Sequence, residues 1–142
     1  MKAYTDEEIA LLAERGAGMH AQGCNCAQSV FLMFAGEAGL DKETARKLMQ
    51  SFGGGCAVGE VCGAFTGAIA ALGLLAQPVT PGDPEAKAAH AARVKALAEA
   101  FREGAGALRC ADLKPEDPEA QKAACGGYIR LGVRLAAEAL RT

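Results

Sequence analysis

Six cysteines are the residues of this 142-residue chain whose chemistry and placement stand out. Four of them lie near predicted helix ends. Cys26 follows a predicted N-cap, Cys62 lies in the first turn of a glycine-striped helix, Cys110 follows a glycine-rich helix end, and Cys125 precedes Gly126-Gly127. Backbone N–H groups at a helix start favour a thiolate, which can be a nucleophile or a metal ligand. Because the four thiols come from four segments, we expect them to converge on one site.

The spacing of the cysteines in the sequence does not by itself determine what this site binds. Four thiolates suit zinc or an iron–sulfur cluster. The compact motifs of zinc ribbons and bacterial ferredoxins are absent, since Cys24-x-Cys26 and Cys56-x5-Cys62 match neither. A thiol–disulfide function is an alternative, without a Cys-x-x-Cys pair to support it. A structural zinc or packed-core module that binds a protein partner is another, because a single Cys also packs as a small hydrophobe.

Capping signals recur along the chain and predict where helices begin. The signals are Thr5 with Glu8, Asn25 with Gln28, Asp41, Asp83-Pro84 and Asp117-Pro118. Apolar residues follow them at the i, i+3, i+4, i+7 spacing of buried helix faces, without persistent period-two alternation. These faces are Ile9, Leu12 and Ala13; Ala27, Val30, Phe31 and Phe34; Ala45, Leu48, Met49 and Phe52; Val94, Leu97, Ala98 and Phe101; and Tyr128, Leu131, Leu135 and Ala139. We predict an all-α fold, a compact single-domain bundle of about five to six helices over residues 1–142.

The fourth predicted helix, from about Glu60 to Gln77, carries small residues at every fourth position. Gly59, Gly63 and Gly67 form this stripe, which favours close helix packing over close approach of a cofactor. The stretch 61–82 has no charge and is nominally long enough for a bilayer. Its prolines and its many Gly, Ala and Thr residues favour a buried central helix instead.

Composition excludes several partner classes. The net charge is −2 with interspersed signs, so neither nucleic acid nor a membrane surface is an expected partner. The first eight residues are polar and acidic, unlike a signal peptide. We therefore expect a cytoplasmic protein, in which cysteines serve as ligands or reactive thiols more often than as disulfides.

Three further residues have chemistry worth weighing. His20 lies four residues before Cys24 and would extend a mixed Cys/His site, although a packed or surface histidine is the favoured interpretation, as it is for His90. Glu60 directly precedes Val61-Cys62. We interpret it as a charge at a helix start rather than as a proton donor to a thiol.

The cysteine pattern also resembles a family. The pattern is typical of a family of redox-active proteins that is related to a domain of split-Soret cytochromes. It consists of one Cys, then Cys-Gly-Ala-x-x-Gly, then two single Cys. Here the pattern consists of Cys26 within Asn25-Cys26-Ala27-Gln28, then Cys62-Gly63-Ala64-Phe65-Thr66-Gly67, Cys110 and Cys125. The flanking segments 52–55 and 60–61 are similar too.

The resemblance implies a small helical redox protein, and many relatives are associated with transporter genes. The related domain of the split-Soret cytochromes accompanies an iron–sulfur-type centre. From four thiols at predicted helix ends in a reducing compartment, our leading hypothesis is an iron–sulfur cluster bound by Cys26, Cys62, Cys110 and Cys125, for electron transfer or redox sensing. Zinc or no metal remains the alternative. A redox partner or a transporter-associated protein is the implied partner, and a homodimer is left open. Haem attachment does not carry over, because Cys-x-x-Cys-His is missing. Cys24 and Cys56 lie outside the pattern and would pair with each other, extend the cluster site or simply pack.

Overall fold

The computed structural model describes residues 3–141, so Met1, Lys2 and Thr142 of the predicted domain lie outside it. Within that range the fold is an all-α bundle, as predicted, and its pairing between extended segments is limited to one bridge between Val61 and Arg109. The helices are α1 (Asp6–Ala21), α2 (Cys26–Ala35), α3 (Lys42–Leu48), α4 (Gly63–Leu75), α5 (Pro84–Ala105), α6 (Cys110–Leu113) and α7 (Pro118–Arg141), with short turns η1 (Gly36–Ala38) and η2 (Gly55–Gly59). Six of these helices correspond to the six predicted ones, and α6 was not expected.

The predicted capping signals are confirmed by hydrogen bonds. Thr5 and Glu8 form a capping box at α1, and Asn25 and Gln28 form another at α2. Aspartate side chains accept from backbone N–H groups at the starts of α3, α5 and α7, as at other helix N-termini. Local sequence therefore determines where most of the helices begin.

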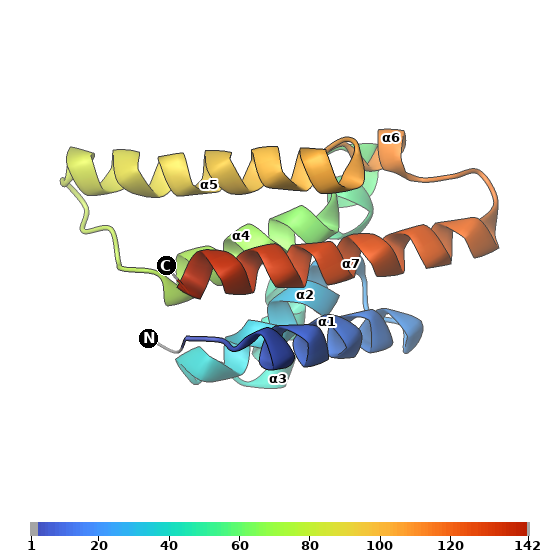
Figure 1. Ribbon diagram of the computed structural model, residues 1–142, viewed down its shortest axis with the longest axis horizontal. Helices are drawn as coiled ribbons and strands as arrows, with labels where there is room; N and C mark the ends of the chain where they lie inside the picture. Colours follow the sequence, from blue (N-terminus) through green and yellow to red (C-terminus); the bar gives the residue numbers. More distant parts are fainter. Residues whose placement is uncertain (1–2, 142) are drawn as a thin grey trace.

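Helices α2, α4 and α7 form the centre of the bundle (Figure 1). α2 packs along α4, α1 and α4 both pack against α7, and the long helix α5 lies along α7 on the side away from α1. The fully buried side chains include Val30 and Phe34 from α2, Leu72 from α4 and Ile129 from α7. The N-terminal part of α7 extends to the same end of the bundle as α6 and the end of α1, and the candidate site lies there.

Glycine allows these helices to approach closely. A Cβ atom on Gly67 would lie 2.6 Å from the carbonyl oxygen of Ala27, and one on Gly132 would lie 2.6 Å from that of Ala64. Real Cβ atoms do not come so near to backbone oxygens, so only glycine permits the α2–α4 and α4–α7 contacts. The small-residue stripe thus serves helix packing, although Gly59 lies outside α4.

Several expectations about helix bounds and faces were wrong. α4 begins at Gly63 rather than near Glu60, because the chain first makes the bridge at Val61. Leu48 is 51% exposed, since α3 ends there after two turns. The buried face of α7 is centred on Ile129, Val133 and Ala136, one residue along from the predicted stripe. None of the helices within residues 3–141 has the length and apolarity needed to cross a membrane.

Candidate functional site

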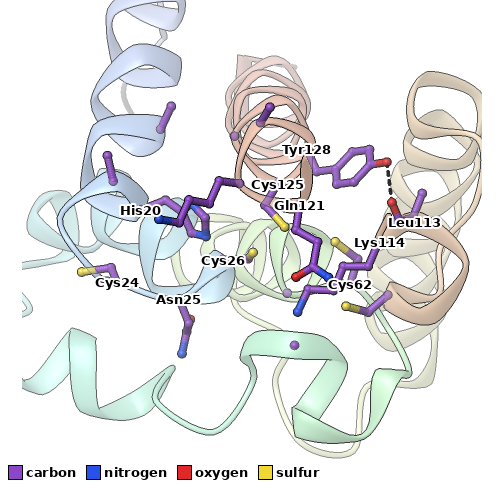
Figure 2. Close-up of a pocket in the computed structure, with 18 of the residues that line it drawn as sticks. His20, Cys24, Asn25, Cys26, Cys62, Leu113, Lys114, Gln121, Cys125 and Tyr128 are labelled. Atoms are coloured by element: carbon purple, nitrogen blue, oxygen red, sulfur yellow. Dashed lines mark hydrogen bonds between the residues drawn. The ribbon is translucent and has the colours of Figure 1, made fainter. Parts of the chain in front are cut away.

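A cavity of about 760 Å³ opens where α1, α2, α4, α6 and α7 meet (Figure 2). Five of the six cysteines line it: Cys24, Cys26, Cys62, Cys110 and Cys125. The four predicted site residues are therefore brought together, and we call Cys26, Cys62, Cys110 and Cys125 the cysteine tetrad. Cys62, Cys110 and Cys125 are buried and Cys26 is partly buried, and all four are free thiols.

Cys26 is held by a network around Asn25. The Asn25 side chain accepts from the Gln28 N–H at 2.8 Å, and its amide donates to the carbonyls of Met49 and Gln50, each at 3.2 Å. The Gln28 amide donates to the Arg46 carbonyl at 2.9 Å. The start of α2 is thus fastened to α3 and the residues after it, which fixes Cys26 at the first position of its helix.

Cys62 and Cys110 are positioned by the bridge between their two segments. The Cys62 N–H donates to the Leu108 carbonyl at 2.8 Å, and the Cys110 N–H donates to the Glu60 carbonyl at 2.6 Å. Cys62 is the N-cap of α4 and Cys110 is the first residue of α6. This pairing sets two thiols side by side although their segments are far apart in the sequence.

Cys125 corrects an expectation. It was expected near a helix end, before Gly126-Gly127, but it lies in the interior of the continuous helix α7. Helix ends therefore position three of the thiols, and the buried face of a long helix positions the fourth. Gly126 and Gly132 lie on the same buried face, so tertiary packing compensates for the low helix propensity of glycine.

The four sulfurs form one electrostatic unit. Every pair within the tetrad interacts, so ionising one thiol makes it harder to ionise the others. Burial is the main cause that raises the pKa values of Cys62 and Cys110. The Cys26 and Cys125 sulfurs lie within 4.8 Å of each other. Their interaction, helped by the positive charge of Lys114, lowers the pKa of Cys125 to about 7 and raises the pKa of Cys26.

The charged side chains that line the cavity are all cationic. Lys114, Lys122 and Arg130 line it, without any carboxylate. Arg130 is neutralised by Glu14 at 2.9 Å. Lys114 and Lys122 form no ion pair within the described part of the chain. The cavity thus favours anionic contents, such as thiolates, although the chain as a whole is acidic.

The other candidate residues differ in whether they line the cavity. Cys24 lines the cavity, whereas Cys56 is exposed and does not line it. Glu60 forms an exposed ion pair with Arg109 at 3.4 Å instead of facing a thiol. His90 lies on α5 and is not among the lining residues.

His20 lies close to two thiols of the tetrad. It lies in the last turn of α1 and faces the cavity. One of its ring nitrogens and the sulfurs of Cys26 and Cys125 all lie within 4.8 Å of one another. The only signal in the sequence was its position four residues before Cys24, which does not reveal that α7 approaches it.

Cys56 points away because of an unusual turn. Gly54, Gly55, Cys56 and Ala57 all have positive φ values, between 58° and 65°. An L-residue in this left-handed region costs about 1–2 kcal/mol, so Cys56 and Ala57 are strained. Gly55 packs directly on the tetrad, since a Cβ there would lie 2.8 Å from the Cys110 Cβ.

The family model described as "Putative redox-active protein (C_GCAxxG_C_C)" matches residues 24–139. That range includes all six cysteines. No curated protein and no solved structure gave a match.

Proposed function

Because this chain belongs to the C_GCAxxG_C_C family of redox-active proteins, we propose that its cysteine tetrad binds an iron–sulfur cluster that serves electron transfer or redox sensing. The observation that carries the proposal is the convergence of four free thiols, from four segments, on one cavity with cationic lining. Bound iron and sulfide would supply one-electron redox chemistry, and the protein would supply the ligands and their surroundings.

The donor set fits such a centre. Iron–sulfur clusters are held by cysteine thiolates, and burying several thiolates together requires compensating positive charge. Bound iron compensates most of that charge, and Lys114 and Lys122 add to it from the cavity wall. Cys62 and Cys110 have raised pKa values because of burial, so metal binding must release protons from them.

The spacing of the sulfurs favours a cluster over a single ion held by the whole tetrad. A tetrahedral zinc ion with Zn–S bonds of about 2.3 Å needs sulfurs roughly 3.8 Å apart. The group of donors that lie within 4.8 Å of one another comprises His20, Cys26 and Cys125, and it includes neither Cys62 nor Cys110. An iron–sulfur cluster is larger than a single ion, so it can bind four sulfurs that lie farther apart than those around one zinc ion.

The test is anaerobic purification, or reconstitution with iron and sulfide, followed by iron and sulfide analysis, visible absorption and electron paramagnetic resonance. We expect a coloured, reducible centre that is lost in single Cys→Ser variants at each tetrad position. Cys56→Ser is the matched control, because Cys56 is exposed and outside the cavity. A protein that takes up no iron or sulfide while its thiols titrate freely would contradict the proposal.

A second function is favoured by one observation, the proximity of the Cys26 and Cys125 sulfurs, which lie within 4.8 Å of each other. Two neighbouring thiols, one with its pKa lowered to about 7, form a dithiol suited to exchange with a disulfide. The pair would lose two electrons and two protons to form one S–S bond, while the partner disulfide gains them and becomes two thiols. Mass spectrometry after mild oxidation should then show a reversible loss of two hydrogens confined to the Cys26 and Cys125 peptides. Cross-links to other cysteines would contradict this alternative.

A further inference from the structure

His20 gives the cavity a fifth donor that the cysteine pattern does not include. It lies on α1, which supplies none of the tetrad. Its ring makes no hydrogen bond to any residue of the described range. A half-buried imidazole without a protein partner, facing two thiols, has the chemistry of a metal ligand rather than of a packing residue.

We propose that His20, Cys26 and Cys125 bind a single divalent ion of the zinc class, independently of Cys62 and Cys110. The ligand atoms of these three residues all lie within 4.8 Å of one another. Zinc bonds of about 2.3 Å to sulfur and about 2.0 Å to nitrogen place ligand atoms roughly 3.5–3.8 Å apart. A contraction of at most about 1.3 Å therefore completes the site.

The donor types agree with this ion. Two thiolates and one neutral imidazole form a mixed sulfur–nitrogen set that suits zinc, and three protein ligands leave a fourth position for water or another small ligand. Since two thiolates balance the ion's charge, the site requires no carboxylate, and none lines the cavity.

This site competes with the proposed cluster, because both use Cys26 and Cys125. The two assignments nevertheless differ in three residues. The cluster requires Cys62 and Cys110 and does not require His20, whereas the single-ion site requires His20 and neither of those cysteines. A crossed pattern of variant effects therefore distinguishes them, and one assignment can fail without the other.

The test uses full-length, cluster-free protein with reduced thiols, titrated with Co(II) and then with Zn(II) in competition with a chromophoric chelator. We expect one ion per chain, with ligand-field bands of tetrahedral Co(II) and thiolate charge-transfer absorption. His20→Ala should weaken Zn(II) binding at least tenfold, since the loss of even an indirect supporting residue weakens metal sites by about 10–100-fold. His90→Ala is the matched control and should leave the affinity unchanged.

The single-ion site also predicts that Cys62→Ser and Cys110→Ser retain Zn(II) while losing the iron–sulfide centre, and that His20→Ala shows the reverse. X-ray absorption of the zinc-loaded wild-type protein provides a measurement that depends on no variant. It should show two sulfur ligands together with nitrogen or oxygen. Four sulfur ligands, Zn(II) binding that Cys62→Ser weakens as much as Cys26→Ser, or an affinity that His20→Ala leaves unchanged would each overturn the proposal.

Discussion

The hydroxyl of Tyr128 donates a hydrogen bond of 3.0 Å to the backbone carbonyl of Leu113 (Figure 2). Leu113 is the last residue of α6, which begins with Cys110, whereas Tyr128 follows Cys125 by one helical turn on α7. One bond therefore connects the short helix that carries one tetrad thiol to the long helix that carries another.

Tyr128→Phe should loosen α6 while leaving α7 intact. Loss of one partly buried hydrogen bond costs about 1 kcal/mol, and α6 is too short to hold its place alone. We expect faster alkylation of Cys110 in metal-free protein, measured by peptide mass spectrometry, with the rate at Cys125 as the internal reference. An unchanged Cys110 rate would show that the bridge to Glu60 is sufficient to hold α6.

Replacing either of two glycines of α7 by alanine should change the stability of the protein in opposite directions. Gly132→Ala should destabilise the protein by about 1–3 kcal/mol, because the new Cβ would lie 2.6 Å from the Ala64 carbonyl and force α4 and α7 apart. Gly127→Ala meets no atom within 4 Å and should stabilise by about 0.5–1 kcal/mol through helix propensity. Chemical denaturation of both variants tests the pair, and a loss of stability at Gly127 would be inconsistent with a continuous α7.

Ala57→Gly should raise stability. Ala57 has φ 62°, a conformation that costs an L-residue about 1–2 kcal/mol and glycine much less. Because glycine also gives the unfolded chain more freedom, we expect a net gain of about 1 kcal/mol by denaturant unfolding. Ala10→Gly, on the exposed face of α1, is the contrasting control and should lose a similar amount. Equal losses in both variants would mean that Ala57 is not strained.

The stability of the protein should decrease in alkali through Tyr4. Its side chain is buried, and it donates to Glu37. Burial, followed by the interaction with Glu37, raises its pKa above the usual 10.0. The folded protein therefore keeps a proton that the unfolded chain loses above about pH 10. The contribution is complete below that pH and declines as pH rises further, by up to about 1.4 kcal/mol per pH unit.

Urea unfolding of wild type and Tyr4→Phe from pH 8 to 11 measures this contribution as a difference, since other groups titrate equally in both proteins. The difference in unfolding free energy should shrink above pH 10. Parallel curves would exclude the proposed linkage.

The parts of the fold that were predictable from sequence are those decided within a few residues. Thr5, Asn25 and Asp83 cap their helices through side chains that reach three residues ahead, so a linear motif is sufficient. The same holds for Cys26, which follows directly after its cap.

What could not be predicted depends on contacts between distant segments. Gly126-Gly127 would break an isolated helix, but packing of α7 on α1 and α4 keeps it whole. The start of α4 moved to Gly63 because Val61 pairs with Arg109. The position of His20 beside the thiols depends on how α1 lies against α7, and no periodicity in either helix contains that information.

The convergence of Cys26 and Cys125 on one cavity has a consequence for biosynthesis. Cys26 belongs to α2 and Cys125 belongs to α7, so Cys26 leaves the ribosome well before Cys125. Since a chain emerges N-terminus first, at about 5–20 residues per second, the site cannot exist while α7 is still being made. Until α7 has been synthesised, Cys26 and Cys62 lack the thiol of Cys125 as a neighbour. Loading of the complete site therefore requires α7, and a nascent chain without α7 offers a metal only part of the site.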